Sequence, residues 1–372
     1  MQYLSQSIIY PDPCRATRVL RRLQQCRPLI PYAEVQLLRQ TLTMVAQKKG
    51  FLLHAGDCSE PFTDSTPKHL YPKLQLLEDL SQYLENHRKQ PILRIGRFAG
   101  QYAKPRSQLK ETQHGKTLPN YRGDLINDSL FTLKARTPDP LRLLQGYRCM
   151  RASVSHLSKY PSKQPFFTSH EALHLAYEKA LSRQNSQKKW YNSGTHFPWL
   201  GVRTQQDPSY LQYLQTIANP IGLKIGPHTS PQTLLSLLRA LNPQQALGKI
   251  VCITRLGHIN VSHLLPPLIQ AVQDAGLPVL WICDPMHGNT SQQAWQKVRY
   301  FNDIRSELEQ SIQIHRQLES YLGGIHLEIT PLAVVECLGG MPETPSPSIS
   351  SPCLVDPQLN RQQAETLLQS CI

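Results

Sequence analysis

The sequence predicts a (β/α)8 TIM barrel (fold class α/β), and three observations lead to that fold. Short apolar runs of strand length occur eight times between residues 51 and 329. Amphipathic segments of helical period separate several of these runs. The length of 372 residues suffices for one such domain with an extension. Apolar strands that alternate with helices form a parallel sheet covered by helices. Eight such units close most naturally into a barrel.

The expected strands are clusters of apolar, β-branched and aromatic residues. They are 51–57, 92–97, 166–170, 196–201, 221–226, 249–255, 278–284 and 323–329. Apolar residues at helical spacing predict the connecting helices. These cover 67–88, 171–182, 231–241 and 264–275, followed by one long helix over 293–320.

The remaining segments interrupt this rhythm. Residues 1–50 are predicted to be an amino-terminal extension, and residues 51–372 the catalytic barrel with a carboxyl-terminal helix. A polar excursion over 103–137 follows the second strand, and an ordered loop of this length is usually functional. Residues 342–352 read as a Pro/Ser linker, and a last helix at about 358–370 is expected outside the barrel.

Composition limits the possible partners. Forty Lys and Arg against 26 Asp and Glu give a net charge of +14, but no basic run reaches five residues and no zinc-finger spacing occurs. Small anionic substrates therefore fit better than nucleic acid, which remains an alternative. Nine cysteines without CxxC pairs indicate a reducing setting. The sequence shows neither a signal peptide nor 18 consecutive apolar residues, so we expect a cytoplasmic protein without a membrane partner. We also expect a homo-oligomer, a dimer.

The predicted strand ends hold the candidate chemistry, because barrel enzymes place catalytic groups at the carboxyl-terminal rim. In chain order these ends contribute Cys58, Arg97, Glu171, Trp199 with Arg203, Lys224, Arg255, His287 and Glu328. Four of these residues are cations from four strands, a set suited to a small ligand with phosphate and carboxylate groups. Ion pairs with the helical shell are the alternative explanation, and for an isolated Arg they would be the better one.

Four residues are candidate metal ligands. They are Cys58, His287, Glu328 and Asp356. A thiolate, an imidazole and two carboxylates suit Mn, Fe, Co or Zn. No short spacing links the four, and any one of them taken singly is more often a buried Cys or a hydrogen-bonded His. Longer motifs are needed to decide.

Nine motifs follow one another in the order of a known family. They are GDCSEPF (56–62), RFAGQYAKPRS (97–107), LPNYRGDLIN (118–127), SHEALHLAYE (169–178), HFPWLGVRTQ (196–205), NPIGLKIGP (219–227), DPMHGNT (284–290), GGIHLEIT with ECLGG (323–340) and DPQLN (356–360). Together they resemble the type II 3-deoxy-D-arabino-heptulosonate 7-phosphate (DAHP) synthases, over about residues 45–365. The resemblance implies a (β/α)8 barrel with an amino-terminal extension, which agrees with the strand count.

The family condenses phosphoenolpyruvate with erythrose 4-phosphate at the start of the shikimate pathway, so the resemblance implies that activity and these partners here. It implies a divalent cofactor, Mn²⁺ first and Co²⁺, Zn²⁺ or Fe²⁺ as alternatives, on the four candidate ligands. It assigns phosphoenolpyruvate binding to Arg97, Trp199, Val202, Arg203, Lys224 and Arg255. It assigns erythrose 4-phosphate binding to Lys104, Arg106, Ser107, Asn127 and Asp284. Glu171 is a candidate for holding the attacking water, and Lys104 for protonating the aldehyde oxygen.

Two departures from the family pattern qualify this assignment. Val202 stands where the family usually has Glu. The stretch between Arg136 and Ser169 is short. Larger members of the family carry additional helices there, which serve feedback binding of aromatic compounds and assembly. In this respect the chain resembles the compact forms of secondary-metabolite, phenazine-type pathways. Two alternatives stay open: a related synthase using another aldose phosphate, and a non-catalytic scaffold or regulator.

Overall fold

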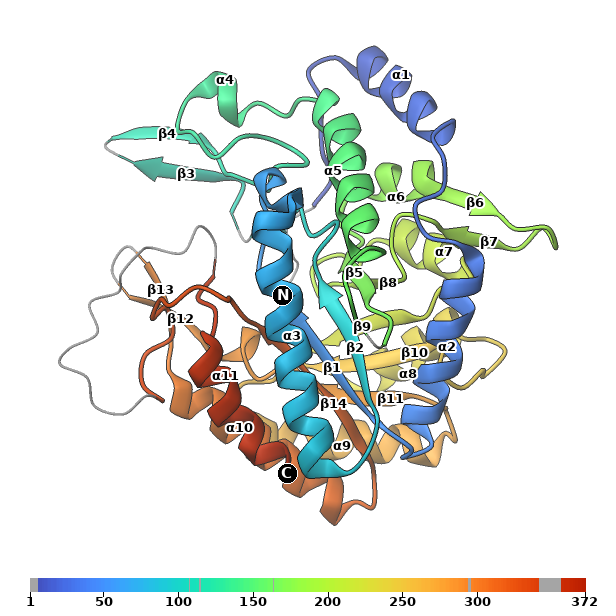
Figure 1. The fold of residues 1–372 in the computed structure, drawn as a ribbon, viewed down its shortest axis with the longest axis vertical. Helices are drawn as coiled ribbons and strands as arrows, with labels where there is room; N and C mark the ends of the chain where they lie inside the picture. Colours follow the sequence, from blue (N-terminus) through green and yellow to red (C-terminus); the bar gives the residue numbers. More distant parts are fainter. Residues whose placement is uncertain (1–5, 107, 114, 163, 294–295, 341–355) are drawn as a thin grey trace.

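Eight parallel strands close into a barrel in the computed structural model of the chain (Figure 1). The structure describes residues 6–106, 108–113, 115–162, 164–293, 296–340 and 356–372. Around the barrel the strand order is β1-β14-β11-β10-β9-β8-β5-β2. The strands are β1 Phe51–Gly56, β2 Ile92–Arg97, β5 Phe167–Glu171, β8 Phe197–Leu200, β9 Ile221–Ile225, β10 Ile250–Thr254, β11 Leu280–Cys283 and β14 Leu322–Glu328. All eight predicted strands are thereby confirmed.

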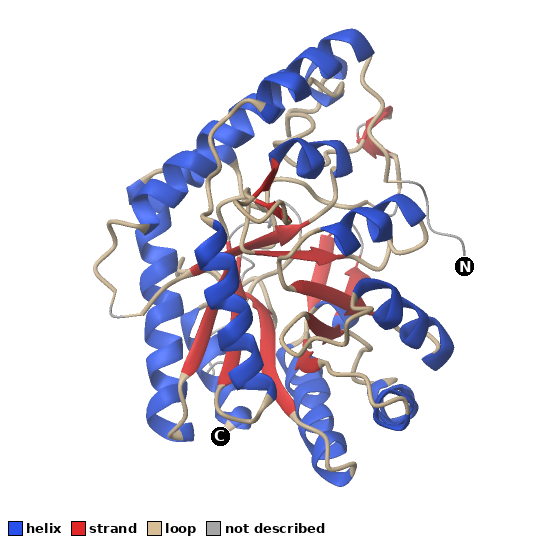
Figure 2. Cartoon of the chain, turned by 90° about the vertical axis from the view of Figure 1, so that its right-hand side faces the viewer, coloured by secondary structure: helices blue, strands red, loops and turns tan. Residues whose placement is uncertain are grey.

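A ring of helices surrounds the strands (Figure 2). They are α3 Pro67–Arg88, α5 Leu141–Leu157, α6 Leu175–Leu181, α7 Pro208–Thr216, α8 Pro231–Leu241, α9 Val261–Asp274 and α10 Phe301–Gln317. The bounds of α3 and α8 match the prediction. At α8 the local signals are explicit: Pro231 occupies the first turn and the Ser230 hydroxyl accepts a hydrogen bond from the backbone N–H of Thr233. Helix α6 begins four residues later than predicted, and α9 three residues earlier.

The predicted helix over 293–320 is wrong in its first part. Residues there form a hairpin of β12 Thr290–Gln293 and β13 Gln296–Arg299, and α10 begins only at Phe301. The physical reason is tertiary. Arg299 is fully buried with its guanidinium on Glu328, and Val298 is buried beside it, so contacts with the barrel mouth override helical periodicity.

The polar excursion forms a second hairpin at the same end of the molecule (Figure 1). It contains β3 Lys110–Gln113, β4 Lys116–Pro119 and the short helix α4 Leu133–Arg136. A third hairpin, β6 Ser182–Gln184 with β7 Trp190–Asn192, follows α6. Single 3₁₀ turns lie at η1 Phe62–Ser65, η2 His287–Asn289 and η3 Gln369–Cys371.

Both ends of the chain pack against the barrel. Helix α1 (Pro13–Gln24) contacts α5 and α6, and α2 (Tyr32–Ala46) contributes Leu38, Leu42 and Val45 to the core of the barrel interior. The predicted last helix is α11 (Arg361–Leu368), which packs on α3 outside the barrel. The predicted linker at 342–352 lies outside the described residues. Among the described helices, none is both long and apolar enough to traverse a bilayer.

Candidate functional site

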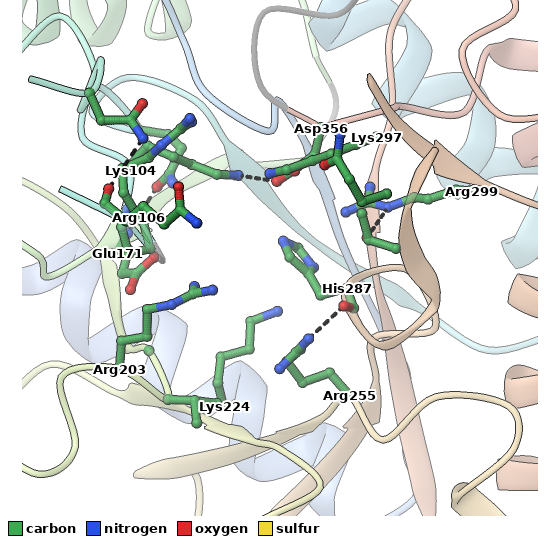
Figure 3. A pocket seen from close by; sticks show the side chains of 18 of the residues that line it. Lys104, Arg106, Glu171, Arg203, Lys224, Arg255, His287, Lys297, Arg299 and Asp356 are labelled. Atoms are coloured by element: carbon green, nitrogen blue, oxygen red, sulfur yellow. Dashed lines mark hydrogen bonds and ion pairs between the residues drawn. The ribbon is translucent and has the colours of Figure 1, made fainter. Parts of the chain in front are cut away.

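A cavity of about 1070 Å³ opens at the carboxyl-terminal mouth of the barrel (Figure 3). Cations dominate the residues that line it. They are Arg97, Lys104, Arg106, Arg203, Lys224, Arg255, Lys297 and Arg299, against the carboxylates of Glu111, Glu171 and Asp356. Such a wall creates a strongly positive potential, because field lines concentrate in a concave, partly desolvated space. The cavity is therefore suited to ligands that carry several negative charges.

The barrel topology explains why residues distant in sequence meet here. Arg97 is the last residue of β2 and Glu328 the last of β14, and both are in register with Gly56 of β1 between them. The Arg97 guanidinium consequently reaches Glu328, with Nη2 2.7 Å from Oε1. Gly56 has φ +145°, and a Cβ there would lie 2.9 Å from the backbone nitrogen of Arg97, so a glycine is required at this point.

Three cations form one wall of the cavity, and Figure 3 shows Arg203, Lys224 and Arg255 pointing into the same space. Lys224, the penultimate residue of β9, is anchored by an ion pair with buried Asp284. Burial, followed by nearby Arg97, lowers the pKa of Lys224 to about 8, although Asp284 opposes this shift. Arg255, directly after β10, donates from Nη2 to the backbone oxygen of His287 at 2.5 Å. Among the described residues Arg203 has no ion pair.

Glu171 faces these cations from the end of β5. Burial raises the pKa of its carboxyl group, while Lys104 and Arg203 act in the opposite direction. The side chain passes so close to Gly201 that a Cβ there would lie 2.0 Å from Glu171 Oε1. Trp199 is buried beside it, and the Arg97 guanidinium lies 5.2 Å from the Trp199 ring centroid. Val202 also lines the cavity and offers an apolar side chain there.

The four predicted metal ligands lie close together. Ligand atoms of Cys58, Glu328 and Asp356 are all within 4.8 Å of one another. The Cys58 thiol lies 3.3 Å from Asp356 Oδ2, and the fourth residue joins through His287 Nε2, 3.0 Å from Glu328 Oε1. Asp356 reaches the site because the segment after it pairs with the end of β14, Leu359 donating its N–H to the Glu328 carbonyl at 2.9 Å. The sequence spacing contained no sign of this pairing.

Cations surround these ligands. Lys104 Nζ lies 2.7 Å from Cys58 Sγ, 2.7 Å from Asp356 Oδ2 and 4.0 Å from Glu328 Oε1. Burial tends to raise the pKa of Glu328, but His287, Arg299, Lys104 and Arg97 together hold it well below its usual range. The pKa of the Cys58 thiol is raised well above its usual value by burial and by the two neighbouring carboxylates. The ammonium of Lys104 therefore lies within 4.0 Å of three of the four candidate ligands.

The donor chemistry fits a divalent ion. A thiol, an imidazole and two carboxylates from separate elements converge, and they attract a cation already. A second group of ligand types, Asp284, His287 and His326, fits less well. Both ring nitrogens of His326 are engaged, by Arg97 and by His54 at 2.8 Å, and Asp284 is held by Lys224 and His287. The first group together with His287 offers four ligand side chains and the second only three, so the first is the better candidate.

Lys297 and Arg299 were not predicted as site residues. Lys297 forms an ion pair with Asp356, and Arg299 Nη1 lies 2.6 Å from Glu328 Oε2. Both side chains come from β13, in the segment predicted to be helical. The available signal was the alternation at 297–299, in which two basic residues flank the buried Val298, a pattern of period two typical of a strand.

The residues predicted for the aldose phosphate are arranged unevenly. Lys104 and Arg106 line the cavity, and Ser107 lies outside the described residues. Asn127 is not among the lining residues: its amide donates to the carbonyls of Asn120 and Arg136 at 2.9 and 3.0 Å, which stabilises the loop around it. Asp284 lies behind the cavity wall, fully buried. Burial raises its pKa, but His287 and Lys224 outweigh that effect and hold it well below its usual range.

The fold and the site define a (β/α)8-barrel protein whose mouth combines a cationic cavity with a set of metal-type ligands. A family model described as the class-II DAHP synthetase family matches residues 1–162 and 150–369. The chain belongs to this family. It is 37% identical to phospho-2-dehydro-3-deoxyheptonate aldolase of Neurospora crassa over 95% of this chain and 89% of that protein. It is 36% identical to a probable phospho-2-dehydro-3-deoxyheptonate aldolase of Pseudomonas fluorescens, over 97% and 92% of the two chains.

A solved structure supports the fold independently. The phospho-2-dehydro-3-deoxyheptonate aldolase of Francisella tularensis superposes with a TM-score of 0.58, at 12% identity, over 98% of this chain and 97% of that one. At this identity the likeness concerns the barrel fold alone.

Proposed function

We propose that this protein is a DAHP synthase that condenses phosphoenolpyruvate with erythrose 4-phosphate and releases inorganic phosphate, the first step of the shikimate pathway. The observation that carries the proposal is the convergence of the cationic cavity and the four metal-type ligands at one barrel mouth. Membership of the class-II family supports it. Each half of the site answers one requirement of the reaction: two anionic substrates must lie side by side, and an aldehyde must be polarised.

Phosphoenolpyruvate binds, in this proposal, to the wall formed by Arg97, Arg203, Lys224 and Arg255. The planar guanidinium groups match phosphate and carboxylate oxygens in pairs, and Lys224 adds a point charge. Trp199 gives the pocket an apolar side on which the enol carbons rest. Val202 contributes shape and a backbone N–H rather than a charge, so the side-chain carboxylate usual in the family is not part of this pocket.

Cys58, His287, Glu328 and Asp356 would hold the divalent metal, for which Mn²⁺ is the first choice and Co²⁺, Zn²⁺ or Fe²⁺ are alternatives. When bound, it would act as a Lewis acid toward the aldehyde oxygen of the second substrate. Lys104 contacts two of these residues, with its ammonium 2.7 Å from Cys58 Sγ and from Asp356 Oδ2, and it also lines the cavity.

The chemistry follows from these positions. The C2=C3 π electrons of phosphoenolpyruvate form the bond from carbon 3 to the aldehyde carbon, and the aldehyde C=O π bond breaks as Lys104 donates a proton to its oxygen. A water held by Glu171 adds to carbon 2 and gives one proton to Glu171. The bond from carbon 2 to the phosphate oxygen then breaks, and inorganic phosphate leaves with the second proton, so that carbon 2 becomes a ketone. Lys104, Arg106 and Ser107 are the groups proposed for erythrose 4-phosphate. We add Lys297, because it lines the cavity and pairs with Asp356 as Lys104 does. Asp284 and Asn127 are better assigned to supporting Lys224 and the 120–136 loop.

A coupled assay tests the proposal by following phosphoenolpyruvate loss with several aldose phosphates, with and without a chelator. Turnover with erythrose 4-phosphate that stops on chelation is the expected result. Preference for arabinose 5-phosphate would favour a related synthase instead. Absence of turnover with every acceptor, in protein that binds metal, would favour a scaffold or regulatory role. Turnover that persists in chelator would reject the metal assignment while leaving the substrates intact.

A further inference from the structure

Beneath the cavity, a line of hydrogen-bonded side chains crosses the barrel interior and ends on Arg97. The Ser169 hydroxyl lies 2.8 Å from the Gly96 carbonyl oxygen and 2.8 Å from His54 Nε2. His54 Nδ1 lies 2.8 Å from His326 Nδ1, and His326 Nε2 contacts Arg97 Nη1. Both imidazoles and the serine are fully buried. None of these three side chains has a role in the reaction proposed above.

The two ends of this line determine the direction of every hydrogen bond in it. A guanidinium nitrogen can only donate, so His326 Nε2 accepts from Arg97 and the proton of His326 is on Nδ1. His326 Nδ1–H then donates to His54 Nδ1, which leaves the His54 proton on Nε2 and directed at Ser169. The Ser169 hydroxyl donates in turn to the Gly96 carbonyl, which can only accept. Reversal of any one link would set two donors or two acceptors against each other in a buried space, which is costly.

The same contacts fix Arg97 from three sides. Its Nε donates to the Asp57 carbonyl at 3.0 Å, Nη2 to Glu328 at 2.7 Å, and Nη1 to His326. A guanidinium carries five N–H groups, so one on each terminal nitrogen remains for a ligand. Arg97 lines the cavity, and one N–H on each of two nitrogens is what a phosphate or carboxylate requires for paired hydrogen bonds.

We propose that His326 and His54 are positioning residues: a one-directional chain of hydrogen bonds, Arg97 to His326 to His54 to Ser169 to Gly96, sets the tautomers of both imidazoles and orients the Arg97 guanidinium toward the anionic substrate. This inference rests on the proposed function only in taking phosphoenolpyruvate as that substrate. The chain of hydrogen bonds begins at Arg97, the last residue of β2, and ends on the backbone of Gly96 in the same strand. The strand that supplies Arg97 therefore also anchors its orientation.

The first test reads the tautomers directly in the full-length protein. Long-range ¹H–¹⁵N NMR on ¹⁵N-histidine-labelled chain should show the neutral Nδ1–H form for His326 and the neutral Nε2–H form for His54, assigned by the loss of signals in His326→Gln and His54→Asn. Any other tautomer, or an imidazolium at neutral pH, overturns the inference. This result needs no catalytic activity.

The second test measures binding of phosphoenolpyruvate by calorimetry. His54→Leu removes the acceptor for His326, and we expect the Kd for phosphoenolpyruvate to rise about tenfold with the KM for erythrose 4-phosphate nearly unchanged. His54→Asn retains an acceptor at the Nδ1 position and should recover most of the loss. His196→Asn is the matched control, because His196 is a buried barrel histidine that binds Thr168 and Glu34 rather than this chain.

The outcomes separate the two proposals. An unchanged Kd in His54→Leu, or an equal rise in His196→Asn, overturns the positioning role. The wild-type protein could instead show the expected tautomers and bind inorganic phosphate but not phosphoenolpyruvate. That result would reject phosphoenolpyruvate as the substrate and leave the positioning role of the histidines open. The same comparison of Kd values, made with inorganic phosphate, then decides the positioning role.

Discussion

Replacing Lys104 with Met should strengthen metal binding, although Lys104 is itself a proposed catalytic group. Its ammonium lies 2.7 Å from Cys58 Sγ and from Asp356 Oδ2, and 4.0 Å from Glu328 Oε1. A divalent ion on these ligands would be repelled by that charge. Methionine has similar length and no charge, so the substitution removes the repulsion with little change in volume.

The magnitude follows from these distances. Two unit charges 4.0 Å apart, the separation of Lys104 and Glu328, interact by about 4 kcal/mol at an effective dielectric constant of about 20. Water in the open cavity screens much of this energy. A net coupling of about 1–3 kcal/mol remains, which corresponds to metal affinity higher by roughly fivefold to 150-fold in the Met variant.

The assay is calorimetric titration of chelator-treated protein with Mn²⁺ in the absence of substrates. Lys297→Met is the matched control: Lys297 contacts Asp356 but is 37% exposed, so solvent screening should limit its effect to a few-fold. A Kd for Mn²⁺ that is unchanged or weaker in Lys104→Met would refute the repulsion by Lys104, and an equal effect of both substitutions would reduce it to general electrostatics.

Three further predictions concern other parts of the molecule. Cys58→Ser should lose metal affinity and most activity while its thermal unfolding stays near wild type, because the thiol contacts a carboxylate and an ammonium and its apolar cluster contains only Tyr121 besides. Arg203→Ala should lower kcat/KM by roughly thirty- to several-thousand-fold, or about 2–5 kcal/mol, measured by steady-state kinetics. Lys249→Met should remove a pH dependence of stability, because burial lowers the pKa of Lys249 from 10.5 to about 7. Between these two pH values the unfolded chain binds one proton more than the folded protein, so the stability of the wild type rises with pH relative to the variant. Denaturant titrations should show this rise as up to about 1.4 kcal/mol per pH unit.

Each of these has a contradicting result. Normal metal affinity in Cys58→Ser would remove the thiol from the ligand set. Full kcat/KM in Arg203→Ala would exclude it from the phosphoenolpyruvate wall. A difference in stability between wild type and Lys249→Met that is constant from pH 7 to pH 10 would mean that the lysine stays charged, held by the carbonyls of Ile217 and Asn219 at 2.6 and 2.7 Å.

The strands were predictable because their signal is local. A strand buried on both faces must be largely apolar, and runs such as 51–57 and 221–226 have that property whatever surrounds them. Parallel pairing then places all carboxyl ends at one mouth, so the convergence of Arg97, Lys224 and Arg255 follows from topology alone. The β12–β13 hairpin was not predictable in this way, because Arg299 adopts its extended conformation to reach Glu328, a residue 29 positions away.

The sequence by itself determined the barrel, the family and most of the groups at its mouth. Hydrophobic periodicity and side-chain chemistry are properties of the individual residues and their order, so they can be read without the fold. Only the tertiary structure decided how those groups interact. It decided that Asp356 reaches Cys58 across 298 positions, that Asn127 supports a loop instead of lining the cavity, and that Lys104 contacts both Cys58 and Asp356. Contacts of this kind depend on distances between side chains from separate strands, and those distances exist only once the barrel has closed.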